Sequence, residues 1–186
     1  RYRHDLGLVY SENLAVAAGV FTLNECKAAP VLYCQKILPS ANVKAIITNS
    51  GQANAATGQE GIESNLRMAQ TLASELKCEA HQVLTASTGV IGQQLPLIKI
   101  MSGIPDLIKR ASDDADNFSL AILTTDLVPK TATKDVQLSE GKIRITGVCK
   151  GSGMIHPNMA TMLGYVFTDV ILTPEKAQSY LKKAVD

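Results

Sequence analysis

Apolar and polar positions divide the chain into segments of clear periodicity. The apolar run VKAIIT at residues 43–48 leads into a polar, glycine-rich loop, which predicts a buried strand. Residues 134–148 alternate apolar and polar side chains around Glu140 and Gly141, which predicts an antiparallel hairpin. A helix is predicted where apolar residues recur at helical spacing, at Ile62, Leu66, Ala69, Leu72, Ala73 and Leu76.

The remaining patterns alternate strands with helices. Further strands are predicted at residues 5–12, 13–22, 81–87, 119–126 and 161–172. Helices are predicted at residues 28–38 and 96–111, and a last one is capped by Thr173 with Pro174 in its first turn. Strands and helices that alternate early, with a hairpin later, predict an α/β layered sandwich of mixed sheets and helices. They do not favour a doubly wound nucleotide-binding fold.

The composition fits a globular protein of one ordinary domain, or half of something larger. Of 186 residues, 46% are hydrophobic, and the net charge is +1 with both signs interspersed. This argues against a nucleic-acid-binding surface and against a polybasic membrane anchor. We find no apolar run of transmembrane length and no opening signal peptide, so we expect a cytoplasmic protein without nucleic-acid or membrane partners.

Cysteine and histidine positions give little support for metal chemistry. The cysteine spacings match no metal-binding pattern, and the histidines do not cluster in the sequence. We therefore expect no metal or cofactor, and we expect reduced cytosolic thiols at Cys26, Cys34, Cys78 and Cys149.

The stretch STGVIG at residues 87–92 follows a predicted strand and is a first candidate site. Thr88 offers a hydroxyl and Gly89 an unshielded backbone N–H, a pair that suits a developing oxyanion. A nucleotide site is less favoured, because the stretch lacks the GxGxxG spacing and a Walker lysine. An ordinary turn is the other interpretation.

The stretch TTDLVPK at residues 124–130 is a second candidate. The hydroxyls of Thr124 and Thr125 at a strand end would hold a polar substrate. The alternative is structural, because threonine suits strands and Asp126 suits the turn that follows one.

The stretch KGSGMIHPNMATML at residues 150–163 is the third candidate. A threonine at position 161 that attacks the carbonyl of Ala160 would cut the chain through an ester, and its new α-amine would then serve as a base. Gly151 and Gly153 permit unusual backbone dihedrals upstream, and Lys150 supplies a positive charge. A glycine-rich loop before a strand is the alternative.

Five stretches in the same order resemble one enzyme family. They are AAGVFTLNECKAAPV, NSGQANAATG, STGVIGQQLP, LTTDLVPK and KGSGMIHPNMATML, and the resemblance runs from about Asp5 to Asp169. They are similar to glutamate N-acetyltransferase, also called ornithine acetyltransferase, of arginine biosynthesis. The resemblance implies self-cleavage between Ala160 and Thr161, with residues 1–160 as the α part and residues 161–186 as the start of the β part.

The resemblance also implies a reaction without cofactor. An acetyl group moves from N-acetylornithine to a threonine and then to glutamate in a ping-pong cycle, and some members of the family also accept acetyl-CoA. The α and β parts are intertwined in a self-cleaving architecture, usually as a dimer of cleaved protomers. The family's roles fall on Thr161 as nucleophile, Thr88 and Gly89 as the oxyanion pair, and Lys150 and Thr124 as substrate contacts, with Thr125 as the alternate to Thr124.

One departure from the family pattern matters. Only 26 residues follow Ala160, whereas a β part of similar length to the α part follows the cut in the family. The β-part glutamate of the family has no counterpart here, so we expect an incomplete active site. Two other functions stay open: an amidase or aminopeptidase on the same architecture, and a non-catalytic module that binds anions or nucleotides.

Overall fold

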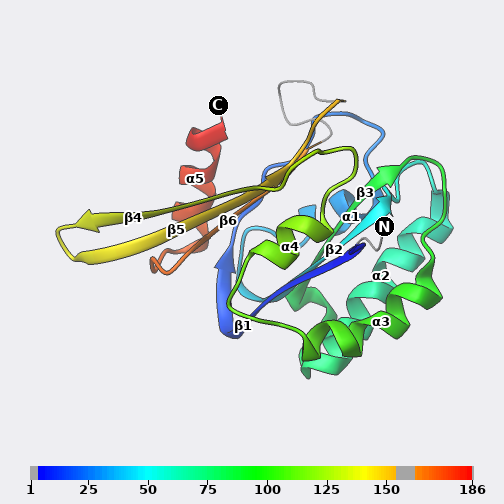
Figure 1. Ribbon diagram of the computed structural model, residues 1–186, viewed down its shortest axis with the longest axis horizontal. Helices are drawn as coiled ribbons and strands as arrows, with labels where there is room; N and C mark the ends of the chain where they lie inside the picture. The colour runs from blue at the N-terminus through cyan, green and yellow to red at the C-terminus, as the bar shows by residue number, and fades with distance from the viewer. Residues whose placement is uncertain (1–3, 154–161, 186) are drawn as a thin grey trace.

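A computed structural model describes residues 4–153 and 162–185, and its first sheet holds three strands. The strand order is β1-β2-β3, with β1 antiparallel to β2 and β2 parallel to β3. Figure 1 shows two long helices, α2 and α3, together on one side of this sheet. The elements are β1 (Leu6–Ala17), β2 (Ser40–Gln52), β3 (Val83–Val90), α2 (Gly58–Leu76) and α3 (Leu97–Lys109).

The second sheet is antiparallel throughout, in the order β4-β5-β6. Its strands are β4 (Lys130–Leu138), β5 (Gly141–Lys150) and β6 (Leu163–Thr168). The hairpin predicted around Glu140 and Gly141 is confirmed, and it extends away from the first sheet and its helices (Figure 1). The last strand is shorter than predicted at both ends, since it covers six residues.

The two faces of β2 explain the layers of the fold. Successive side chains of a strand point to opposite sides of the sheet. Ile47 packs with Met68 of α2 and Ile104 of α3 in the main hydrophobic core. On the other face, the Thr48 hydroxyl lies 2.8 Å from the Tyr165 hydroxyl of β6. The first sheet therefore lies between its helices and the second sheet, as the predicted α/β layered sandwich requires.

The helix predicted between Ile62 and Leu76 is confirmed, but the predicted buried face is partly wrong. Ala69 and Leu72 are buried, whereas Ile62 and Leu66 are 44% and 41% exposed. The face toward the sheet is extended by small or polar residues near the N-terminus of α2, namely Gly61, Ser64 and Asn65. A β-carbon at position 61 would clash with the side chain of Thr57, so the close approach there excludes large side chains.

The strand predicted at residues 119–126 is wrong. Residues Asp116–Ala121 form a short helix, α4, followed by a turn that leads into β4. Phe118 and Ile122 lie four residues apart and are buried with Val148 of β5 in one cluster. Spacing of four residues places two side chains on the same helical face, and a short apolar run does not distinguish a helix from a strand.

The two strands predicted at residues 5–12 and 13–22 form one strand, β1, which ends at Ala17, so the prediction is wrong for residues 18–22. Its pairing with β2 shifts register between Tyr10 and Ala15, and again before Ala17. Such irregularities let one strand continue through a local break in its pattern. Beyond β1, Gly19 exchanges backbone hydrogen bonds with the Gln178 side chain of the last helix.

The helices predicted at either end of the chain are confirmed. They are α1 (Ala29–Gln35), with Pro30 in its first turn, and α5 (Pro174–Val185). The Thr173 hydroxyl accepts a hydrogen bond from the Lys176 N–H, which satisfies a backbone donor at the start of α5. Among the described residues, we find no helix with the length and apolar character needed to span a membrane.

Candidate functional site

Thr88 and Gly89 lie inside the end of β3, not in a turn after it as the sequence predicted. They pair with Ser50 and Gly51 of β2 in the parallel ladder. Thr88 is 8% exposed and Gly89 is exposed. Gly89 has a φ of +132°, and a β-carbon there would clash with the carbonyl of Gly51. Only glycine therefore fits this position without displacing the neighbouring strand.

Lys150 and Thr124 meet directly. The Lys150 ammonium donates a hydrogen bond to the Thr124 hydroxyl at 3.3 Å, and Lys150 is 6% exposed. Burial lowers the pKa of Lys150, the Asp126 carboxylate opposes this effect, and the Lys130 ammonium adds to it. Thr125 is exposed. Of the two candidate threonines, Thr124 is therefore the one in contact with the candidate lysine.

Asp126 organises the segments around this pair, a role that sequence reasoning missed when it assigned Asp126 to a turn. Its side chain is fully buried and accepts hydrogen bonds from the Lys130 ammonium at 2.6 Å and from the Gly151 N–H at 2.8 Å. A longer contact of 3.4 Å reaches the N–H of Thr124. Burial raises the pKa of Asp126, but these donors outweigh it and lower the pKa to about 2.

Two polar contacts join the first sheet to neighbouring elements near these residues. The Ser50 hydroxyl donates a hydrogen bond of 2.7 Å to the carbonyl of Ala121, the last residue of α4. Ser50 is also the ladder partner of Thr88, and Ala121 lies shortly before Thr124 in the chain. The second contact joins Thr48 to Tyr165, whose pKa is raised by burial. The first sheet is therefore attached both to α4 and to β6.

The predicted cleavage site, Ala160 and Thr161, lies outside the described residues. The strands on either side of it are described, and Lys150 of β5 lies directly opposite Leu163 of β6 in the antiparallel ladder. Within residues 4–153 and 162–185, we find no cluster of His, Cys, Asp and Glu side chains that would hold a metal ion.

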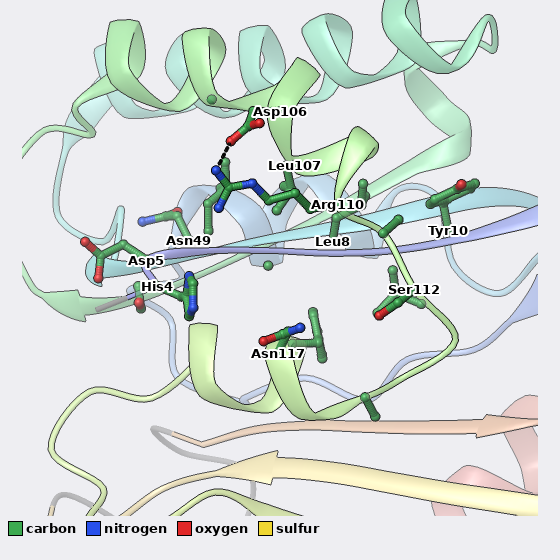
Figure 2. Close-up of a pocket in the computed structure, with 18 of the residues that line it drawn as sticks. His4, Asp5, Leu8, Tyr10, Asn49, Asp106, Leu107, Arg110, Ser112 and Asn117 are labelled. Atoms are coloured by element: carbon green, nitrogen blue, oxygen red, sulfur yellow. Dashed lines mark ion pairs between the residues drawn. The ribbon is translucent and has the colours of Figure 1, made fainter. Parts of the chain in front are cut away.

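An open groove of about 1130 Å³ lies along β1, between α3 and α4. Figure 2 shows His4, Asp5, Asn49 and Asn117 at this groove, together with the ion pair between Asp106 of α3 and Arg110, the residue that follows this helix. Thr88, Gly89, Thr124 and Lys150 are not among its lining residues, although their neighbours Ser50 and Gly51 are. Sequence reasoning did not anticipate the groove, because its walls come from segments far apart in the chain.

Comparison with known proteins places the chain among arginine-biosynthesis proteins. The profile of the ArgJ family matches residues 1–186. The arginine biosynthesis bifunctional protein ArgJ of Thermotoga neapolitana is 47% identical over all of this chain and 47% of its own length. The Synechocystis protein of the same name is 46% identical over 97% of this chain and 44% of its own length. The chain thus spans about half the length of the curated relatives it matches.

Solved structures agree with this match. The ArgJ crystal structure from Bacillus halodurans aligns with a TM-score of 0.78 and 39% identity, over 86% of this chain and 85% of that one. Ornithine acetyltransferase from Mycobacterium tuberculosis, solved in complex with ornithine, aligns with a TM-score of 0.75 and 36% identity, over 82% of each chain. The sequence, the fold and the match along its whole length together show that the chain belongs to the ArgJ family.

Proposed function

We propose that this chain is the acetyl-transferring half of a self-cleaving acetyltransferase of arginine biosynthesis. Residues 1–160 form its α part, and residues 161–186 begin a β part that completes the site. The enzyme moves acetyl from N-acetylornithine to glutamate through an ester on Thr161, without a metal or cofactor. Its relatives carry the name of this bifunctional enzyme, and one solved relative is complexed with ornithine.

The single observation that carries the proposal is the register between β5 and β6. Lys150 lies opposite Leu163, and Leu163 comes two residues after Thr161 in the sequence. Because two residues of chain span at most about 7 Å, this register supports the proposal that Thr161 acts beside the buried Lys150 and its partner Thr124. A nucleophile and a cation for substrate carboxylates would then share one end of the second sheet.

Chain lengths support a cut near the middle of the full protein. The curated relatives are about twice as long as this chain. The aligned chains of the solved relatives are of nearly equal length to it, since the alignments cover similar shares of both partners. A precursor divided into two parts of similar size would give this pattern.

Cleavage would begin when the Thr161 hydroxyl attacks the carbonyl of Ala160. The amide nitrogen of Thr161 leaves as an amine, and an ester joins the two parts until water hydrolyses it. The freed α-amine lies beside the hydroxyl of the same residue. Because an α-amine ordinarily has a pKa of about 8, it accepts and returns a proton at neutral pH.

Acetyl transfer would then follow in two balanced steps. The Thr161 oxygen attacks the acetyl carbon of N-acetylornithine, the tetrahedral intermediate collapses, and ornithine leaves with the proton held by the α-amine. The amine of glutamate attacks the acetyl ester in turn, which releases N-acetylglutamate and restores the hydroxyl. Thr88 and Gly89 would stabilise the oxyanion in both steps, and one such donor is worth about 2.7–4 kcal/mol.

Substrate binding would use Lys150 and Thr124. The Lys150 ammonium is a point charge suited to the carboxylate that both amino-acid substrates carry. Since the Thr124 hydroxyl accepts a hydrogen bond from Lys150, it fixes the direction of that charge. We also propose that the full enzyme is a cytoplasmic dimer of cleaved protomers. Acetyl-CoA is a second donor to be tested beside N-acetylornithine.

The proposal is tested with the full-length protein and its Thr161→Ala variant. Intact mass should show two fragments that meet at Ala160 and Thr161 for the wild type, and one uncut, inactive chain for the variant. A Thr161→Ala variant that is still cleaved and still transfers acetyl would contradict the mechanism. The partition of acetyl between glutamate and water decides between a transferase and an amidase, because a transferase delivers acetyl to glutamate in preference to water.

A further inference from the structure

We propose that Asp126 is a positioning residue for substrate binding, which holds the Lys150 ammonium against the Thr124 hydroxyl. The inference rests on the proposed function, because its readout is the binding of an anionic amino-acid substrate. Asp126 would act through Lys150 and Thr124 and would not itself touch the substrate.

The contacts of Asp126 join the two substrate-binding segments. One carboxylate oxygen accepts the N–H of Gly151, the residue next to Lys150, at 2.8 Å. The other accepts the N–H of Thr124 at 3.4 Å. The same group therefore fixes the backbone on both sides of the hydrogen bond from Lys150 to Thr124. A fully buried carboxylate with several donors is held rigidly, since each lost donor would leave buried charge unpaired.

Two neighbouring groups of opposite charge act on Lys150, and they form an ion pair with each other. Within the described part of the chain, Asp126 after α4 raises the pKa of Lys150, and Lys130 at the start of β4 lowers it. Burial is the largest effect and also lowers the pKa of Lys150, so the Asp126 carboxylate opposes both burial and Lys130. Asp126 therefore favours the protonated form of Lys150, the form that binds a substrate carboxylate.

Two substitutions, which remove charges of opposite sign, test this assignment in the full-length enzyme. Asp126→Asn keeps the shape of the side chain but removes its charge. The alkaline limb of kcat/KM for N-acetylornithine should then move to lower pH, with a rise in KM larger than the fall in kcat. Lys130→Gln removes the neighbouring cation, so the limb should move to higher pH. A merely structural role would not predict shifts of opposite direction.

Asp135→Asn is the matched control, on the hairpin that follows Asp126. Asp135 pairs with Lys142 and Arg144 at 2.8 Å on the solvent-facing part of β4 and β5, so its loss should leave the pH profile unchanged. Profiles of the Asp126 and Lys130 variants that match the wild type, or that move in the same direction, would overturn the inference.

The outcomes also separate this inference from the proposed function. A wild-type enzyme that transfers no acetyl group would contradict the proposed function. If the wild type transfers acetyl but the alkaline limb of kcat/KM does not move in the variants, only the proposed role of Asp126 is contradicted. If Asp126→Asn does not fold by circular dichroism, the Lys130→Gln profile decides alone, and the absence of an upward shift in it would overturn the inference.

Discussion

Gly89 of β3 lies against the backbone of Gly51 so closely that a β-carbon on Gly89 would clash with the Gly51 carbonyl and lie 2.8 Å from the Gln52 nitrogen. Gly89 also has a positive φ of +132°. We expect Gly89→Ala to lower the free energy of unfolding by about 3 kcal/mol, because backbone strain and a steric clash act together. Urea unfolding of the purified protein measures this change.

Gly92 provides the control for Gly89. It also has a positive φ, of +80°, but a β-carbon there would meet open space. Gly92→Ala should therefore cost only the backbone strain, about 1 kcal/mol. Equal losses for the two substitutions would contradict the close approach of β3 to β2 as the cause.

Thr124 and Thr125 should differ sharply in substrate binding. Thr124→Val removes the acceptor of the Lys150 hydrogen bond, so KM for N-acetylornithine should rise about tenfold, as expected for a hydrogen bond to a charged group. Thr125 is exposed, and Thr125→Val should change KM less than about twofold. Steady-state kinetics of the full-length enzyme gives both values. A larger effect at Thr125 would reverse the assignment.

The sequence predicted those elements whose periodicity is long. The hairpin of β4 and β5 alternates over residues 134–148, and a glycine marks its turn, so both its register and its position follow from the pattern. The helix α4 is too short to show a periodic pattern of this kind. Its apolar residues are continuous with those of the turn after it, and tertiary contact with both sheets decides that this run is a helix that buries Phe118 and Ile122.

The sequence singled out candidate residues only where one continuous stretch contains the signal. Lys150, Thr124, Thr88 and Gly89 were singled out by residue type and local context, and the structure joins the first two. Asp126 was not singled out, because its role depends on the hydrogen bond from the Gly151 N–H, and Gly151 lies far from it in the sequence. An aspartate that follows threonines in a turn has the same local sequence whether it is exposed or buried.

Phe118 should be the most sensitive residue of α4. It is 6% exposed and makes edge-to-face contacts with Tyr165 and Phe167 of β6, at ring distances of 5.0 and 6.4 Å. Phe118→Ala should cost about 3–5 kcal/mol of unfolding free energy, because it leaves a cavity between the sheets. Leu120 on the same helix is 40% exposed, so Leu120→Ala should cost less than about 1 kcal/mol. Similar losses in urea unfolding would show that α4 does not pack as described.

Thr48 and Tyr165 allow a direct measurement of how strongly the sheets are coupled. Thr48 is fully buried, so Thr48→Val or Tyr165→Phe alone leaves one buried hydroxyl without its partner and should cost about 1–2 kcal/mol. The double variant leaves neither hydroxyl and should cost less than the sum of the two, by a coupling energy of about 1 kcal/mol in a double-mutant cycle. The exposed hydroxyl pair of Thr133 and Thr146, 3.0 Å apart on β4 and β5, is the control and should show almost no coupling, because water replaces the lost partner. Additive losses at Thr48 and Tyr165 would mean that apolar packing alone joins the two sheets.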